Sequence, residues 1–339
     1  MAKFKKNLSI ALKITLGVGL ILYLIFSGSL NLHSIGQAIS MHPWWFLLAA
    51  SLLSIPLFLT SVRWQMLLLA QETNITLWKT LSLNFIGLFF NNFLPGATGG
   101  DLAKCYYVAS IYPDKKTATI TTVLLDRFLG LSGLILVGGI SVLCYPKISL
   151  YGSGPIKTMS TTILLASAAI LIGLVLFLNF PVSFIETYPE KFSHLPGGKL
   201  LLKFYHAIRI YRDHQAVLYI SLFLSILVHT TIIIMTIIFG RIFNAQLSWR
   251  IFGVITPLTL LANALPVAPA GLGVGEAASE YLYLKVGCSL GGEFMALFHL
   301  VSISWGFFLG FPFYLLFKKK PELSTDSHYS SELENIYEG

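Results

Sequence analysis

The sequence contains few charged residues for its length. Asp, Glu, Lys and Arg make up 11% of its 339 residues, whereas soluble domains carry roughly 25%. Hydrophobic residues account for 55% of the chain, and the mean hydropathy is +0.75. This composition excludes an ordinary soluble domain. It predicts an all-α polytopic membrane protein, because backbone groups in lipid must find their hydrogen-bond partners within the helix itself.

Cysteine is also scarce, and two common catalytic motifs are missing. Cys105, Cys144 and Cys288 are too scattered for a disulfide framework or a metal site. The chain has no Gly-x-x-x-x-Gly-Lys nucleotide loop and no His-Glu-x-x-His pair. We therefore expect no cofactor, no metal and no enzyme activity of a recognisable class.

The net charge of +8 arises from basic residues that lie between apolar runs. This placement is typical of membrane topology signals and not of a nucleic-acid binder, so no nucleic-acid partner is expected. Each full span needs about 20 apolar residues. The sequence predicts six of them, at about 8–27, 43–62, 118–144, 160–180, 217–239 and 293–317.

Two further apolar stretches are interrupted by proline and glycine. The first covers about 80–109 and is broken at Pro95, and the second covers about 252–286 and is broken from Pro266 onward. Irregular backbone at membrane depth is tolerated only where it is buried in protein or lines a cavity. We therefore predict two re-entrant helix pairs, each of which returns to the face from which it entered.

The distribution of basic residues supports this topology. With the N-terminus inside, 17 of the 23 Lys and Arg residues lie on the cytoplasmic side and 5 lie outside, as the positive-inside rule requires. Both termini are then cytoplasmic, in a multi-pass protein of the cytoplasmic (inner) membrane. Residues 1–145 and 146–317 form an inverted-topology repeat. A linker at about 182–216 contains a basic amphipathic segment, either on the membrane surface or solvated, and a disordered tail covers 318–339.

The two breaks share a pattern that ends in glycine and a carboxylate, Asp101 in the first and Glu276 in the second. Either acid could simply stabilise the first turn of a helix. Alternatively, both line a central polar cavity and pair with Arg63 and Arg241. The asparagines before the breaks could cap the broken helix ends or line the same cavity. The further residues expected at this substrate site are Asn91, Asn92, Gly99, Gly100, Asn263, Gly271, Gly273 and Gly275.

Asp126 and Arg127 are adjacent within a predicted span. Neighbouring side chains on a helix point about 100° apart, so the two cannot share one environment. A structural ion pair between helices is one interpretation. The other is a contact between Arg127 and a lipid phosphate, which a guanidinium binds through two parallel hydrogen bonds. We expect His229 and His299 to bond neighbouring helices.

Three motifs in this order resemble a known family. They are Asn91 to Asp101, Asp126-Arg127, and Pro269 to Glu276, and together they resemble the transmembrane region of lysylphosphatidylglycerol synthase and its stand-alone flippase-like relatives. The resemblance covers about 8–317. In the full-length synthases this region is joined to an aminoacyl-transferase domain, which we do not expect here because the tail after Lys320 is too short to fold as one.

The resemblance implies a lipid translocator that moves a phospholipid or a lipid-linked head group between leaflets. By matching motif, it assigns functional importance to Asp101, Asp126, Arg127 and Glu276. An alternative is a membrane-embedded transferase, or the partner subunit of one, acting on a lipid-linked donor. The expected partner is a membrane lipid, most simply an anionic one. A homo-oligomer and a separate transferase partner both stay open.

Overall fold

The computed structural model describes residues 22, 23, 25, 26, 31–92, 99–146, 154–179, 209–265 and 267–318. Within these ranges all regular structure is helical, which confirms the predicted all-α polytopic membrane fold. Five helical segments are long and apolar enough to cross a membrane, namely Pro43–Ala70, Pro113–Cys144, Ile156–Leu178, Gln215–Ile242 and Gly291–Phe317. They match five of the six predicted spans.

Three other segments predicted from the sequence fall largely outside the described residues. They are the first span, the linker up to residue 208 and the tail after residue 318. The division of the chain into two membrane repeats stays a prediction.

The first long segment combines α3 (Pro43–Leu52) and α4 (Ser54–Ala70), after the short α2 (Leu32–Met41). Pro43 opens α3, at a position where a missing N–H costs nothing. The segment continues past the predicted end at residue 62, so Arg63 lies within a helix and not at its boundary.

Two helical arms follow, α5 (Leu77–Asn91) and α6 (Gly99–Ile111), and they pack against each other. Their close approach depends on glycine, because a Cβ on Gly100 would overlap the backbone carbonyl of Gly87. We call α5 and α6 the first hairpin. The single turn η1 (Pro113–Lys115) then leads into α7 (Lys116–Cys144).

The rest of the chain repeats this order of elements. A long helix, α13, precedes a second hairpin made of α14 and α15, whose connection includes the turn η2; the chain ends in α16, a π-helical turn η3 and α17. The bounds are α9 (Pro155–Asn179), α13 (Gln215–Ile242), α14 (Trp249–Asn263), η2 (Pro269–Gly271), α15 (Val274–Leu284), α16 (Gly291–Trp305), η3 (Gly306–Gly310) and α17 (Phe311–Lys318).

Helices of the first half of the chain pack on the second hairpin, and helices of the second half pack on the first hairpin. Helix α13 packs along both α4 and α7, and α7 also packs on α14 of the second hairpin. In return, η3 and α17 pack on α5 of the first hairpin, where Gly310 allows contact with the Phe85 carbonyl. Stacked rings of Phe85 and Phe313 seal this contact. Each hairpin is therefore supported by the last long helix of the other half.

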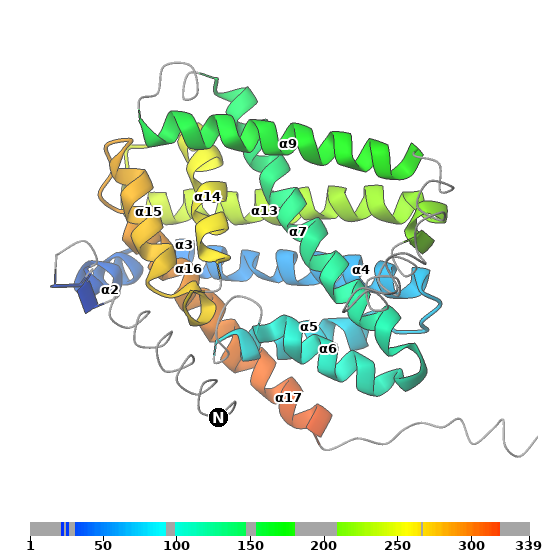
Figure 1. Ribbon diagram of the computed structural model, residues 1–339. Helices are drawn as coiled ribbons and strands as arrows, with labels where there is room; N and C mark the ends of the chain where they lie inside the picture. The colour runs from blue at the N-terminus through cyan, green and yellow to red at the C-terminus, as the bar shows by residue number, and fades with distance from the viewer. Residues whose placement is uncertain are drawn as a thin grey trace, which may run out of the picture.

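The hairpins begin at opposite ends of the helix bundle. In Figure 1, α4 and α13 run in opposite directions, and each hairpin starts from the end that its preceding long helix reaches. The first arm of each hairpin ends at a common cavity, since Asn91 of α5 and Asn263 of α14 both line it. An inverted-topology repeat predicts this arrangement.

The contact between α7 and α13 generates a stability prediction. A Cβ on Gly133 would overlap Ser225 of α13, whereas a Cβ on Gly173 of α9 meets nothing within 4 Å. Gly133→Ala should destabilise the protein by about 1–3 kcal/mol through overpacking. Gly173→Ala should be neutral or stabilising, since alanine favours a helix by about 1 kcal/mol. Thermal unfolding in detergent compares the two variants, and equal midpoints would contradict the tight α7–α13 contact.

Candidate functional site

A cavity of about 300 Å³ lies between the first hairpin and the long helices, and reaches the end of α14. Six helices line it, namely α4, α5, α6, α7, α13 and α14. Leucine, valine and isoleucine side chains form much of the wall. The charged side chains in the lining are Arg63, Asp101, Lys104, Asp126 and Arg127. Three cations thus face two carboxylates, which leaves the lining with a net positive charge.

The tightest ion pair of the site joins α4 to α7. The Arg63 Nε donates to Asp126 Oδ1 at 2.6 Å, and both side chains are buried, with 5% and 7% of their surface exposed. The Arg63 Nη1 also donates to Ser225 Oγ of α13 at 2.6 Å. A buried ion pair is favourable only when further hydrogen bonds satisfy its members. This pair is therefore the structural inter-helix contact that was one of the two sequence-based interpretations.

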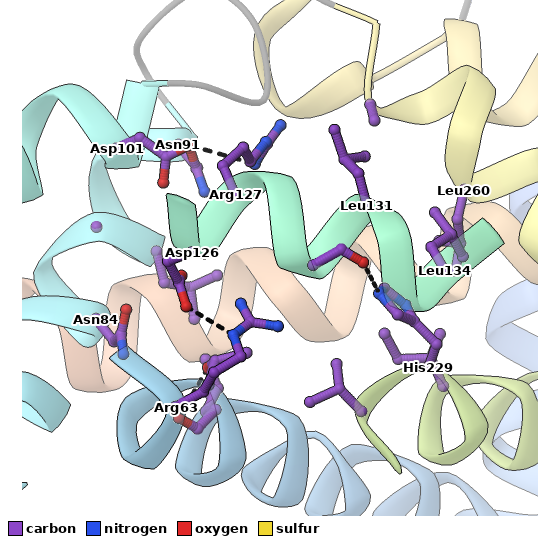
Figure 2. A pocket seen from close by; sticks show the side chains of 18 of the residues that line it. Arg63, Asn84, Asn91, Asp101, Asp126, Arg127, Leu131, Leu134, His229 and Leu260 are labelled. Carbon is purple, nitrogen blue, oxygen red and sulfur yellow. Dashed lines mark hydrogen bonds and ion pairs between the residues drawn. The ribbon is translucent and has the colours of Figure 1, made fainter. Parts of the chain in front are cut away.

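Arg127 leaves α7 on a different side from Asp126 and extends toward α6 (Figure 2). Its Nη1 lies 3.4 Å from Asp101 Oδ2, while the Lys104 Nζ lies 3.7 Å from Asp101 Oδ1. Charge-assisted hydrogen bonds are usually 2.7–2.9 Å long. The Arg127 side chain is also 33% exposed. Two cations thus share one carboxylate through long, partly exposed contacts.

Asn91, at the end of α5, joins the two arms of the first hairpin. Its Oδ1 accepts a hydrogen bond of 2.6 Å from the backbone N–H of Gly100, in the first turn of α6. This is the capping role that the sequence suggested for the asparagines, and Asn91 also lines the cavity. Gly99 and Gly100 are buried in the same turn. Asn92 lies next to Gly306 of η3 and outside the cavity lining.

The second hairpin uses an asparagine in a similar place. Asn263 ends α14, and its side chain fills the space in which a Cβ of Gly271 or Gly275 would stand. Gly271 and Gly273 have φ angles of 79° and 80°, which favour glycine. In both hairpins an asparagine at the end of the first arm thus packs against glycine near the start of the second. Asn263, like Asn91, lines the cavity.

Glu276 has a different environment from Asp101. It is 2% exposed, and its Oε2 accepts a hydrogen bond of 2.7 Å from the Gly273 N–H. Its Oε1 lies 2.6 Å from His299 Nδ1, and the other ring nitrogen lies 3.2 Å from Asn263 Oδ1. Glu276 lies outside the cavity lining and holds the second hairpin to α16. Its partner is therefore His299, and not Arg241 as the sequence suggested.

Arg241, another predicted site residue, lies outside the cavity lining. It is exposed in the last turn of α13, with its guanidinium 6.0 Å from the centre of the Trp45 ring. Arg63 and Arg241 thus occupy unlike positions. The predicted residues that do line the cavity are Arg63, Asn91, Asp101, Asp126, Arg127 and Asn263.

Four polar residues of the cavity were not predicted as site residues, namely Thr60, Asn84, Lys104 and His229. Lys104 lies three positions after Asp101, a spacing that puts both side chains on one face of a helix and could have revealed it. His229 had only been expected to bond a neighbouring helix. Its Nε2 does so, at 3.0 Å from the Gly130 carbonyl of α7, but the residue also lines the cavity.

The two kinds of ion pair predict different costs of mutation. Asp126→Asn leaves the Arg63 charge buried without its counter-charge, which should destabilise the protein by about 3 kcal/mol. Asp101→Asn breaks long, partly exposed contacts and should cost less than about 1 kcal/mol. Thermal unfolding in detergent measures both variants. The double variant Arg63→Met with Asp126→Leu should recover part of the loss, and a mild effect of Asp126→Asn would contradict a structural role for the pair.

Comparison with known proteins places the chain in a family. A family model described as "Lysylphosphatidylglycerol synthase TM region" matches residues 10–310. A UPF0104 membrane protein of Pyrococcus horikoshii is 24% identical over 306 residues, which cover 81% of this chain and 87% of that protein. No solved structure matches the chain. Because the family model covers most of its length, this protein belongs to the lysylphosphatidylglycerol synthase transmembrane-region family.

Proposed function

We propose that this protein moves a phospholipid, or a lipid-linked head group, from one leaflet of the membrane to the other. The phosphate binds in the cavity beside α7 while the acyl chains stay in the bilayer. The observation that carries this proposal is the loose pairing of Arg127 and Lys104 with a single carboxylate, Asp101, inside a membrane helix bundle. Ionisable groups at such positions are costly to bury and mark substrate pathways.

An anionic phosphate suits the charge balance of the cavity. Both contacts of Asp101 exceed the length of a strong charge-assisted hydrogen bond. The two parallel hydrogen bonds of a phosphate to Arg127 would therefore be stronger than the contact with Asp101 that they replace. When the lipid leaves, Asp101 again pairs with both cations. The carboxylate thus acts as an internal substitute for the substrate.

The buried pair of Arg63 and Asp126 has a separate role in this proposal. It fixes α7 against α4 and, through Ser225, against α13. Arg127 follows Asp126 directly, so this fixed contact also sets the direction in which Arg127 points. Arg63 contributes positive charge to the cavity but already has two short hydrogen bonds within the protein.

The paired hairpins supply a route to both leaflets. We interpret them as re-entrant helix pairs that enter the membrane from opposite faces and meet near its middle. In transporters built from inverted repeats, the substrate binds where such broken helices meet, and the repeats rock against each other. The sequence has no nucleotide-binding loop, so we expect movement driven by the lipid gradient or by an ion gradient.

Lipid movement in liposomes tests the proposal directly. Purified protein is reconstituted with phosphatidylglycerol labelled on an acyl chain, and loss of label from the outer leaflet is followed with a membrane-impermeant quencher. Arg127→Gln should lower the rate at least tenfold, since a hydrogen bond to a charged group contributes about 1.5–3 kcal/mol. Arg241→Gln removes an arginine outside the cavity and should leave the rate unchanged.

Wild-type protein that moves no lipid, with or without a proton gradient, would contradict a translocator. The transferase alternative would then be tested by incubating the same protein with a labelled lipid-linked donor and an acceptor.

The variant Asp101→Asn tests whether Asp101 helps to release the lipid phosphate from Arg127 and Lys104. Without the competing carboxylate, Arg127 and Lys104 should hold a phosphate more tightly, so the variant should saturate at lower lipid concentration and show a lower maximal rate. The rate is measured across a series of lipid fractions in the liposomes. Wild-type rates at every fraction would contradict the exchange of Asp101 for phosphate.

A further inference from the structure

His229 lines the cavity, and one of its two ring nitrogens is buried with no partner among the described residues. Its Nε2 lies 3.0 Å from the Gly130 carbonyl oxygen, which can only accept, so Nε2 carries the hydrogen. In the neutral ring Nδ1 then holds a lone pair and acts as an acceptor. This Nδ1 is buried and has no hydrogen-bond partner among the described residues. The hydrogen bond between α7 and α13 thus gives Nε2 a partner, whereas Nδ1 has none in the part of the chain that the structure describes.

The other uncharged polar side chains of the cavity differ from His229 in this respect. Asn84 donates to Ser61, Asn91 accepts from Gly100, and Asn263 contacts His299. The Thr60 hydroxyl donates to backbone carbonyls of its own helix. The described part of the chain therefore supplies a partner for each of them, but no donor for His229 Nδ1. A buried acceptor left unpaired is costly, which points to a donor that comes from a ligand.

The position of His229 relates it to the proposed phosphate site. Gly130, which holds its ring, follows Arg127 by three residues on α7, a separation of about 4.5 Å along the helix axis. Figure 2 shows Arg127 extending from α7 and His229 reaching α7 from the neighbouring helix α13, and both residues line the same cavity. A head group whose phosphate binds Arg127 and that lies along α7 therefore extends toward His229.

We propose that His229 Nδ1 accepts a hydrogen bond from the far end of the lipid head group and so selects lipids whose head group carries an O–H or N–H donor. This inference rests on the proposed function and names the substrate class of the same cavity. Phosphatidylglycerol and phosphatidylethanolamine carry such donors. Phosphatidylcholine has the same net charge as phosphatidylethanolamine, but its quaternary ammonium has no N–H. A site built around a hydrogen bond rejects an analogue that lacks the donor.

Acyl-labelled phosphatidylethanolamine and phosphatidylcholine form the matched pair for the test, with phosphatidylglycerol as a third lipid. Wild-type protein should move both donor lipids at least tenfold faster than phosphatidylcholine. His229→Leu should bring all three rates to the phosphatidylcholine value. His229→Gln retains one donor and one acceptor and should keep much of the preference. The control His33→Leu removes an exposed histidine of α2 and should change nothing.

A binding measurement separates this inference from the proposal of transport. Thermal unfolding in detergent is followed with glycerophosphoethanolamine, glycerophosphoglycerol or glycerophosphocholine. The first two should raise the midpoint more than the third, and His229→Leu should abolish the difference. If no lipid moves but this difference in midpoint is present, translocation is rejected and the role of His229 stands. Equal shifts for all three compounds, or a preference that survives in His229→Leu, would overturn the inference.

Discussion

The structure depends on one constraint, that charged groups within a membrane bundle must be neutralised by other parts of the protein. The Arg63–Asp126 pair meets it by joining α4 to α7, and its bond to Ser225 adds α13. These three long helices form the frame on which both hairpins rest. Removing one member of this pair would leave the other charge buried without a partner, which is strongly destabilising. The pair therefore favours the observed packing of α4, α7 and α13. Arg127, next to Asp126 on α7, then takes its direction from a fixed neighbour.

The two acids that follow the hairpin breaks have diverged in role. Glu276 is enclosed by the Gly273 N–H and His299, so its charge is used within the second hairpin. Asp101 stays in the cavity and shares its charge between Arg127 and Lys104 through longer contacts. The carboxylate of the second hairpin thus supports the structure, whereas that of the first hairpin lies in the cavity between two cations. We take this asymmetry as the reason to place the proposed phosphate site beside the first hairpin.

Sequence patterns predicted the fold class well because hydrophobicity acts over whole segments. Five predicted spans and both broken stretches correspond to helices of the structure, although α4 extends to Ala70. Sequence reasoning also selected six residues of the cavity lining, among them four of its five charged side chains. It could not assign partners, since Arg63 and Asp126 are 63 residues apart and Glu276 and His299 are 23 residues apart. It also favoured Arg241, whose charge lies in a similar sequence context but at the exposed end of α13.

The sequence by itself determined that this is a helical membrane protein with two interrupted segments, because apolar length and Pro/Gly breaks are local properties. It also suggested that asparagines before the breaks cap helix ends, and Asn91 does accept a hydrogen bond from the Gly100 N–H in the first turn of α6. Only the tertiary structure decided that Asp101, and not Glu276, lines the cavity, and that one ring nitrogen of His229 is buried without a partner among the described residues. The physical reason is that these outcomes depend on which helices pack together, and close packing of distant segments is not encoded in any single motif.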